Sequence, residues 1–195
     1  MYDLRTHTMS YLDKKYYVLG DSERILIFNL CSFLGLPKGV MYLDGMSDEF
    51  ADFKIANGQL YLTSFCIASK IDECPELQGV KPIGMSFGLV QYSNLLKRVE
   101  FTGNLVFGNS PKNVTQNTTL FRANCLNGDV KGVQDFSDQV QKVCQNIENL
   151  KQKFYQEDAV HSKTSKQKRL LSKKITSIKN DLSEEIYGSD LHNYR

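Results

Sequence analysis

The sequence lacks any long apolar segment. Its longest apolar-rich run, residues 25–36, is interrupted by Asn29, Ser32 and Gly35. No stretch approaches the roughly 18 consecutive apolar residues that are typical of a membrane-spanning helix. Residues 1–17, MYDLRTHTMSYLDKKYY, also lack the basic start followed by an apolar core that marks a signal peptide. We therefore expect a protein that neither spans a membrane nor is exported.

Cysteine pairs with the spacing of a metal or redox site are absent as well. The five cysteines are scattered along the chain: Cys31, Cys66, Cys74, Cys125 and Cys144. Their number is odd and none belongs to a C-x-x-C motif. In a chain without an export signal, cysteines of this kind are reduced thiols, several of them buried. This pattern predicts a cytoplasmic protein.

Motifs for metal binding and phosphate binding are also missing, and no histidine lies in a catalytic context. The only histidines, His7, His161 and His192, lie near the termini or in the link between the two predicted C-terminal helices, none within a G-x-S-x-G or comparable motif, and they are expected in exposed loops. H-E-x-x-H, calcium-loop, G-x-x-x-x-G-K-[ST] and G-x-G-x-x-G patterns do not occur. Residues 44–49 gather three carboxylates beside a glycine, but such acidic turns are usually only solvated. We therefore predict no catalytic residue, no metal and no cofactor.

A β-hairpin over residues 50–67 is the strongest folding signal that is present. Its sequence, FADFKIANGQLYLTSFCI, has two extended apolar runs that meet at Asn57 and Gly58. These residue types adopt the positive φ angles of a two-residue hairpin turn at little cost. The resulting pairing sets Asp52 opposite Thr63. One face of the hairpin then carries the apolar residues Phe53, Ile55, Leu60 and Leu62.

A helix is predicted before this hairpin. Asp21 or Ser22 can cap it, Gly35 can end it in a left-handed conformation, and Pro37 prevents its continuation. The run is apolar almost all round, which indicates a buried helix. A buried strand over residues 24–30 is the alternative, since short apolar runs do not distinguish the two.

Further strands are expected before residue 131. We assign strands to residues 16–19, as the first of the chain, and to 40–43, 99–108 and 118–123, with a second turn at Asn127-Gly128. In residues 99–108 the apolar face would carry Phe101, Leu105 and Phe107, and Val106 would lie on the opposite face. Residues 87–96 fit a strand or a short helix, and the pattern does not decide between them.

Two of these segments resemble parts of known proteins. Residues 53–62, FKIANGQLYL, and 101–108, FTGNLVFG, are similar to segments of small β-rich bacterial proteins of unassigned function, whose central hairpin has the form I-x-[ND]-G-x-L-Y-L. The resemblance covers about residues 40–130 and leaves out the C-terminal part, because those proteins lack a helical tail of this kind. It implies a type of fold and no activity, so no functional residue follows from it.

From Asp135 onward the pattern changes to helical spacing. A first apolar series recurs every three or four residues: Phe136, Val140, Val143, Ile147, Leu150 and Phe154. A second follows a polar link at residues 157–165: Leu171, Ile175, Ile178, Leu182 and Ile186. We predict two amphipathic helices, the first capped by Asp135, that form a helical hairpin. The same spacing occurs in coiled coils, so the hairpin can pack on itself, on the body or on a second copy of the chain.

These signals together predict an α+β fold. An antiparallel β-rich body with one early helix would occupy residues 1–130, and a C-terminal two-helix hairpin would occupy residues 131–195. The change of hydrophobic period is the basis for dividing the chain there.

A basic run distinguishes the second C-terminal helix. Residues 162–179 contain seven Lys or Arg residues and no acid. We assign partner binding to its residues Lys166, Arg169, Lys173 and Lys174. Such a face can bind an acidic protein surface or phosphates, or it can be solvated and bind nothing. Aromatic residues that would strengthen a nucleic-acid interpretation are absent between Tyr155 and Tyr187.

The sequence therefore favours a non-enzymatic protein that binds another protein or a second copy of itself through the helical hairpin. An immunity or inhibitor protein of bacterial or phage origin is the most specific form of this hypothesis. The alternative is a nucleic-acid-associated protein that binds through the basic helix, with strongly salt-dependent affinity. An enzyme assembled from scattered Asp, Glu, Tyr and Cys residues is a third hypothesis, and it would require a deep pocket.

Overall fold

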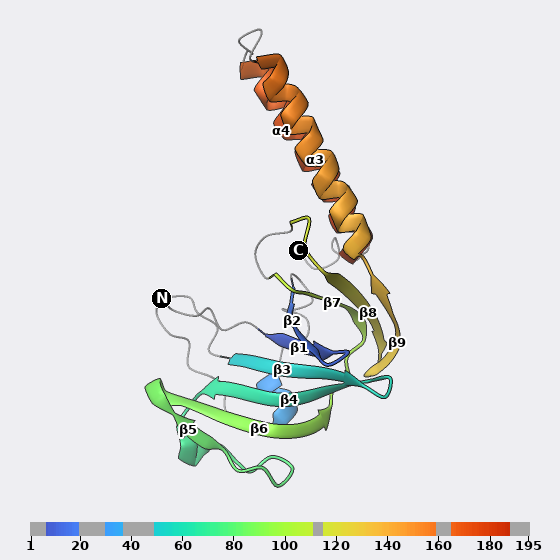
Figure 1. The fold of residues 1–195 in the computed structure, drawn as a ribbon. Coiled ribbons are helices and arrows are strands. Elements are labelled where there is room, and N and C mark those ends of the chain that lie inside the picture. Colours follow the sequence, from blue (N-terminus) through green and yellow to red (C-terminus); the bar gives the residue numbers. More distant parts are fainter. Residues whose placement is uncertain (1–6, 20–29, 37–48, 111–114, 159–164, 188–195) are drawn as a thin grey trace.

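The computed structural model describes residues 7–19, 30–36, 49–110, 115–158 and 165–187. The predicted α+β class is confirmed, since a β-rich body is followed by two long helices. Figure 1 shows these helices, α3 and α4, side by side and projecting from one end of the body.

The elements have the following bounds. The strands are β1 (Thr8–Tyr11), β2 (Lys14–Val18), β3 (Glu49–Ala56), β4 (Gln59–Ala68), β5 (Ile83–Met85), β6 (Leu89–Arg98), β7 (Gly103–Gly108), β8 (Leu120–Leu126) and β9 (Asp129–Asp135). The α-helices are α2 (Leu30–Leu34), α3 (Ser137–Asp158) and α4 (Ser165–Tyr187), and the 3-10 turns are η1 (Ile71–Glu73) and η2 (Ser86–Gly88). The helical hairpin thus begins at Ser137, after a strand that extends beyond residue 131.

Seven of the strands close into a small barrel in the order β3-β1-β2-β7-β8-β9-β4, because β4 pairs again with β3. Strands β6 and β5 extend the sheet outward from β4. The predicted antiparallel body is therefore incomplete as a description: the sheet is closed, and β1 pairs with β3 in parallel. Neither feature has a local sequence signal, because both depend on strands that are far apart in the chain.

The predicted hairpin is confirmed as β3 and β4. Asn57 and Gly58 have φ angles of 50° and 69°, and Ile55 pairs with Leu60 as expected. One pairing was wrong: Asp52 lies opposite Ser64, because the register shifts between Asp52 and Phe53. The apolar face is buried as predicted at Phe53, Leu60 and Leu62, and Ile55 is partly buried.

Aromatic side chains fill the part of the core that lies beneath β1, β2, β7 and β8. The rings of Tyr11, Tyr16, Phe107 and Phe121 contact one another, with centroids 5.3 to 5.8 Å apart. Most of these contacts are edge-to-face, the arrangement that the ring quadrupoles favour. The four rings join strands from two distant parts of the sequence.

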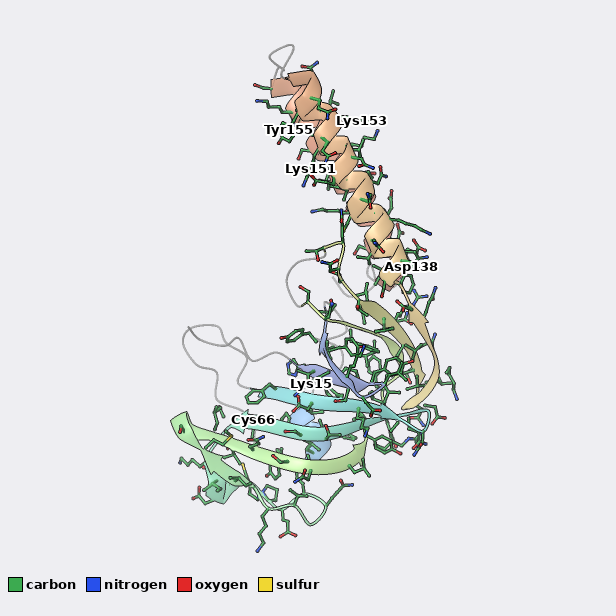
Figure 2. The ribbon with its side chains drawn as sticks, viewed as in Figure 1. Lys15, Cys66, Asp138, Lys151, Lys153 and Tyr155 are labelled. Atoms are coloured by element: carbon green, nitrogen blue, oxygen red, sulfur yellow. The ribbon has the colours of Figure 1, made fainter. Side chains whose placement is uncertain are left out.

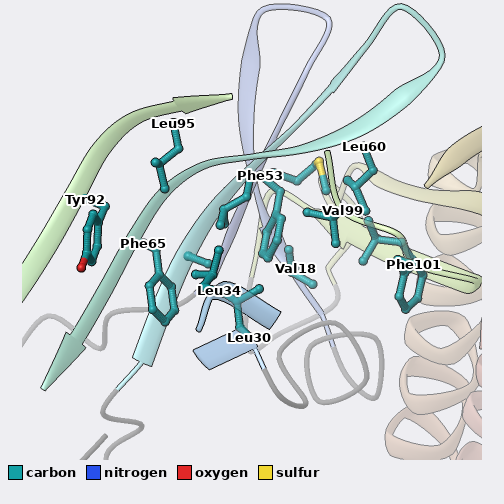
Figure 3. Packing of buried hydrophobic residues seen from close by; sticks show 14 of the residues in the cluster. Val18, Leu30, Leu34, Phe53, Leu60, Phe65, Tyr92, Leu95, Val99 and Phe101 are labelled. Carbon is teal, nitrogen blue, oxygen red and sulfur yellow. The ribbon is translucent and has the colours of Figure 1, made fainter. Parts of the chain in front are cut away.

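A short helix covers another side of this core. In Figure 3, Leu30 and Leu34 of α2 lie among Val18, Phe53 and Phe65. The long early helix predicted from Asp21 or Ser22 is not shown, since the structure has only these five helical residues and the predicted start lies outside the described residues.

Other strand predictions need correction. The strand predicted at residues 16–19 corresponds to the second strand, β2, which ends at Val18. Strand β1 precedes it, and the two are joined by a turn at Leu12 and Asp13 with φ angles of 49° and 57°. The undecided segment 87–96 is mainly strand β6. Val106, expected on the polar face of its strand, is fully buried. The segment 40–43 lies outside the described residues.

His7 also differs from its expected place in an exposed loop. Its side chain is 3 % exposed, and its Nδ1 accepts a hydrogen bond of 3.0 Å from the Ala51 N–H. Burial lowers the pKa of His7 to about 4, although Asp52 opposes this shift. The neutral imidazole therefore links the start of β1 to β3.

Two turn glycines provide a matched test of backbone strain. Gly58 and Gly128 both have positive φ, but a Cβ at Gly58 meets nothing within 4 Å, whereas one at Gly128 would lie 2.4 Å from the Val99 carbonyl oxygen. We expect Gly58→Ala to lower the free energy of unfolding by about 1 kcal/mol, and Gly128→Ala to lower it by clearly more. Urea denaturation measures both, with Gly132→Ala, which meets no neighbour, as control. An equal loss of unfolding free energy in Gly58→Ala and Gly128→Ala would contradict the close approach of Gly128 to the Val99 carbonyl oxygen.

The buried His7 predicts a loss of stability in acid. Since its pKa is about 4 when folded and about 6.5 when unfolded, only the unfolded chain takes up this proton between those values, and stability falls as pH decreases from 6.5 to 4. The full effect approaches about 3 kcal/mol. In His7→Asn, whose Oδ1 can accept the same Ala51 N–H, this part of the pH dependence should vanish. Urea denaturation of both proteins at pH 7 and pH 4.5 tests this. An equal loss of unfolding free energy between the two pH values in wild type and His7→Asn would refute it.

Candidate binding surface on the helical hairpin

The first helix of the hairpin starts from strand β9 through the predicted cap. Asp135 Oδ1 accepts hydrogen bonds from the Ser137 N–H at 2.8 Å and from Ser137 Oγ at 2.5 Å. Ser137 Oγ in turn accepts the Leu120 N–H at 3.1 Å. The helix start is thereby tied to strand β8, and the acidic Asp138 in the first turn suits the positive end of the helix.

The lower end of the hairpin packs on the outer face of the barrel. We call the buried residues at this contact the base cluster: Leu19, Val106, Leu120, Phe136, Val140, Leu182 and Ile186. The base of α3 contacts β8, and α4 contacts β7. This contact explains the burial of Val106, because the hairpin covers the face of β7 that would otherwise meet water.

Arg122 reinforces this attachment. Its Nη1 donates to the backbone carbonyl oxygens of Glu185 at 2.8 Å and Ile186 at 3.3 Å, both in the last turn of α4. Its Nη2 donates to Gln134 Oε1 at 2.8 Å, and its guanidinium lies 4.9 Å from the Phe136 ring centroid. A cation at a helix C-terminus is favourable, because the last carbonyls lack partners within the helix.

Beyond the base cluster the two helices contact each other but extend away from the body (Figure 1). Figure 2 shows Asp138 at the base of the hairpin and Lys151, Lys153 and Tyr155 toward its tip. The predicted apolar series accordingly changes environment along the helices. Its members near the body are buried, whereas the outer ones are only partly covered: Leu150, Phe154, Leu171, Ile175 and Ile178.

A hollow of about 460 Å³ lies between the two helices in this outer half, and we call it the distal groove. Its apolar lining comes from both helices: Phe154, Tyr155, Leu171 and Ile175. Tyr155 is 63 % exposed. Phe154, Leu171 and Ile175 are partly covered, so the groove keeps apolar surface that another molecule could bury.

Positive charge surrounds the distal groove. Three lysines line it, Lys151 from α3 and Lys168 and Lys179 from α4, and no acidic side chain does so. Lys151 Nζ lies 3.8 Å from Glu148 Oε2, an exposed pair that contributes little. Lys168 and Lys179 make no ion pair with any carboxylate that the structure describes.

The residues assigned to partner binding from the sequence are not those that line this groove. Arg169, Lys173 and Lys174 are exposed on α4, outside the lining, and the side chain of Lys166 is not among those described. Sequence reasoning considered one helix alone and therefore missed Lys151 and Tyr155, which reach the groove from the other helix. Their spacing of four residues on α3 was the available signal.

Other candidate sites do not gather comparable groups. Burial raises the pKa of the Cys125 thiol to about 11 and also raises that of Cys144, which Lys179 partly offsets, and this is opposite to the shift of a reactive cysteine. His161, His192 and residues 44–48 lie outside the described residues. Within the described ranges, no group of three or more His, Cys, Asp or Glu side chains is arranged to hold a metal ion.

A second hollow, of about 390 Å³, lies on the outer surface of β8 and β9. Arg122 and Lys131 are its charged lining. Arg122 is already bonded to the hairpin, and Lys131 lies 3.2 Å from the Asp129 carboxylate. Lys131 and, to a smaller extent, Arg98 lower the pKa of that carboxylate. These interactions account for the charged groups of this surface.

None of the helices in the described part of the chain has the length and apolar character needed to cross a membrane. Searches against models of known protein families, curated proteins and solved structures found no match for this chain.

The attachment of the hairpin to the barrel predicts a local effect at Arg122. We expect Arg122→Gln to leave the barrel folded and to increase amide hydrogen exchange at the end of α4 by roughly tenfold, because the last carbonyls of α4 lose a charged donor worth about 1–2 kcal/mol. Exchange measured by mass spectrometry tests this. Lys131→Gln is the matched control, since Lys131 lies in the neighbouring strand β9 and pairs with Asp129 of the same strand. Unchanged exchange at residues 182–187 in Arg122→Gln would contradict the assignment.

Proposed function

We propose that this chain is a non-enzymatic protein that binds another protein through the distal groove of its helical hairpin. The observation that carries the proposal is the partial exposure of apolar residues from two helices that are held away from the body. Burying such residues against a partner gains free energy in proportion to the apolar area removed from water. The barrel would serve as the support that holds the hairpin in position.

The character of the groove favours a protein over a small substrate. It is lined by large apolar side chains and lysines, without the convergent set of polar groups and shifted pKa values that typify a catalytic pocket. The most strongly shifted groups, His7 and Tyr92, lie elsewhere, in the core of the body. Burial lowers the pKa of His7, whereas burial and the nearby Cys74 raise the pKa of Tyr92. Their shifts follow from burial in a packed interior.

In its most specific form, the proposal is an immunity or inhibitor protein of bacterial or phage origin that acts in the cytoplasm. Helices of 22 and 23 residues extend about 33 Å, so the hairpin could enter or cover a cleft of a toxin or effector. Cys66, Cys74 and Cys125 are buried thiols without a disulfide, which suits a reducing compartment. Self-association through the helices remains an outcome for experiment.

Affinity capture with matched variants tests the proposal. The tagged protein is incubated with a lysate of the cells that naturally express it, with and without nuclease, and bound proteins are quantified by mass spectrometry. Leu171→Ser removes an apolar residue from the groove, whereas Leu170→Ser makes the same change at an exposed neighbour outside its lining. We expect one stoichiometric protein that survives nuclease and is captured by wild type and Leu170→Ser, but about tenfold less by Leu171→Ser.

The other outcomes separate the alternatives. Loss of all captured material after nuclease treatment would favour the nucleic-acid hypothesis. Equal capture by Leu170→Ser and Leu171→Ser would exclude the groove as the binding surface. Far-UV circular dichroism of both variants shows whether the helices persist, so a folding defect can be recognised.

A further inference from the structure

We infer that the occupant of the distal groove is a single acidic amphipathic helix of the partner protein. This inference rests on the proposed function and names the chemistry of the partner. It follows from the shape of the groove, the distribution of its apolar residues and the sign of its charge.

The shape of the groove fits a third helix. Two antiparallel helices in contact leave a shallow channel parallel to their axes, and a further helix packs into such a channel with its own apolar ridge. On α4 the lining extends from Lys168 to Lys179, which corresponds to about 17 Å of helix. A partner helix of about three turns would cover this length.

The apolar residues are arranged to receive such a ridge. Leu171 and Ile175 are one turn apart on α4, and Phe154 lies across from them on α3. All three are partly covered, so each retains surface that a partner side chain can bury. Helix-in-groove recognition uses anchors with this spacing on the bound helix, at positions i, i+3 or i+4, and i+7.

The charge of the groove selects an acidic partner. Its lysines come from both helices, so carboxylates on either flank of a bound helix would find a cation. Lys168 and Lys179 have no carboxylate partner among the described residues, which leaves their charge available. Complementary charge of this kind raises association rates and disfavours basic partners.

The same charge argues against a second copy of the chain as the occupant. Two distal grooves placed face to face would bring three lysines of one copy against three of the other. Like charges in a partly buried interface are costly. A nucleic acid would satisfy the lysines but would leave the apolar lining without a partner, apart from stacking on Tyr155.

Designed peptides test the inference directly. The probe is a fluorescent helical peptide of about three heptads with leucines on one face and glutamates flanking them. One control has the same composition in an order that separates the leucines, and another replaces glutamate with lysine. Fluorescence anisotropy with the full chain should show binding of the first peptide alone, weakening as salt is added because the flanking charges become screened.

Paired charge variants locate the binding surface. Lys168→Glu alters the groove, whereas Lys173→Glu makes the same change on an exposed residue of α4 outside the lining. We expect Lys168→Glu to weaken binding of the acidic peptide about tenfold and Lys173→Glu to change it less than about twofold. The lysine-bearing peptide should gain affinity for Lys168→Glu, a result that loss of folding cannot produce.

Several results would overturn the inference. The first is equal binding of the amphipathic acidic peptide and its reordered control, and the second is an equal effect of Lys168→Glu and Lys173→Glu. The third is competition by a short duplex oligonucleotide whose binding is lost in Lys168→Glu but kept in Leu171→Ser. A dimer in analytical ultracentrifugation that Leu171→Ser dissociates would assign the groove to a second copy. Lysate capture that depends on Leu171 without any peptide binding would leave the proposed function in place and refute only the acidic helix.

Discussion

The position of the hairpin depends on one constraint: strands β7 and β8 are covered on both faces. On the inner face, Phe107 and Phe121 belong to the aromatic core of the barrel. On the outer face, Val106 and Leu120 pack against the two helices. Because this outer apolar patch matches only the lower end of the hairpin, the base cluster is buried and the remaining length of both helices is left to contact each other and solvent. A barrel with a polar outer face at β7 and β8 would give the helices no place to dock.

Local features of this fold were predictable, and features that depend on closure were not. Asn57-Gly58 and Asn127-Gly128 are turns because their residue types tolerate positive φ, and this needs no knowledge of the rest of the chain. The turn at Leu12 and Asp13 has the same backbone conformation without glycine or asparagine, so β1 was overlooked. The register shift at Asp52, the parallel pairing of β1 with β3 and the closure of the ring are non-local, because each is decided by strands that meet only after folding.

The candidate site was predictable to the same extent. The spacing of apolar residues identified both helices of the hairpin, and the basic run drew attention to α4. The residues that line the distal groove come from both helices, however. Which residue of α3 lies beside Lys168 and Leu171 of α4 is set by how the two helices pair. A pattern along one helix places Lys173 and Leu171 on different sides, but it does not show which side the other helix leaves open.

The attachment through Arg122 and the base cluster has a mechanical consequence. Both helices are fixed at one end, and the described part of each is about 33 Å long when measured from that end. The hairpin is therefore a lever whose pivot is the short contact with β7 and β8. A rotation of about 10° at the pivot would displace the tip by about 6 Å, which follows from the length of the helices alone. Small changes in packing around Phe136 would thus become large changes in where the tip of the hairpin lies relative to the barrel.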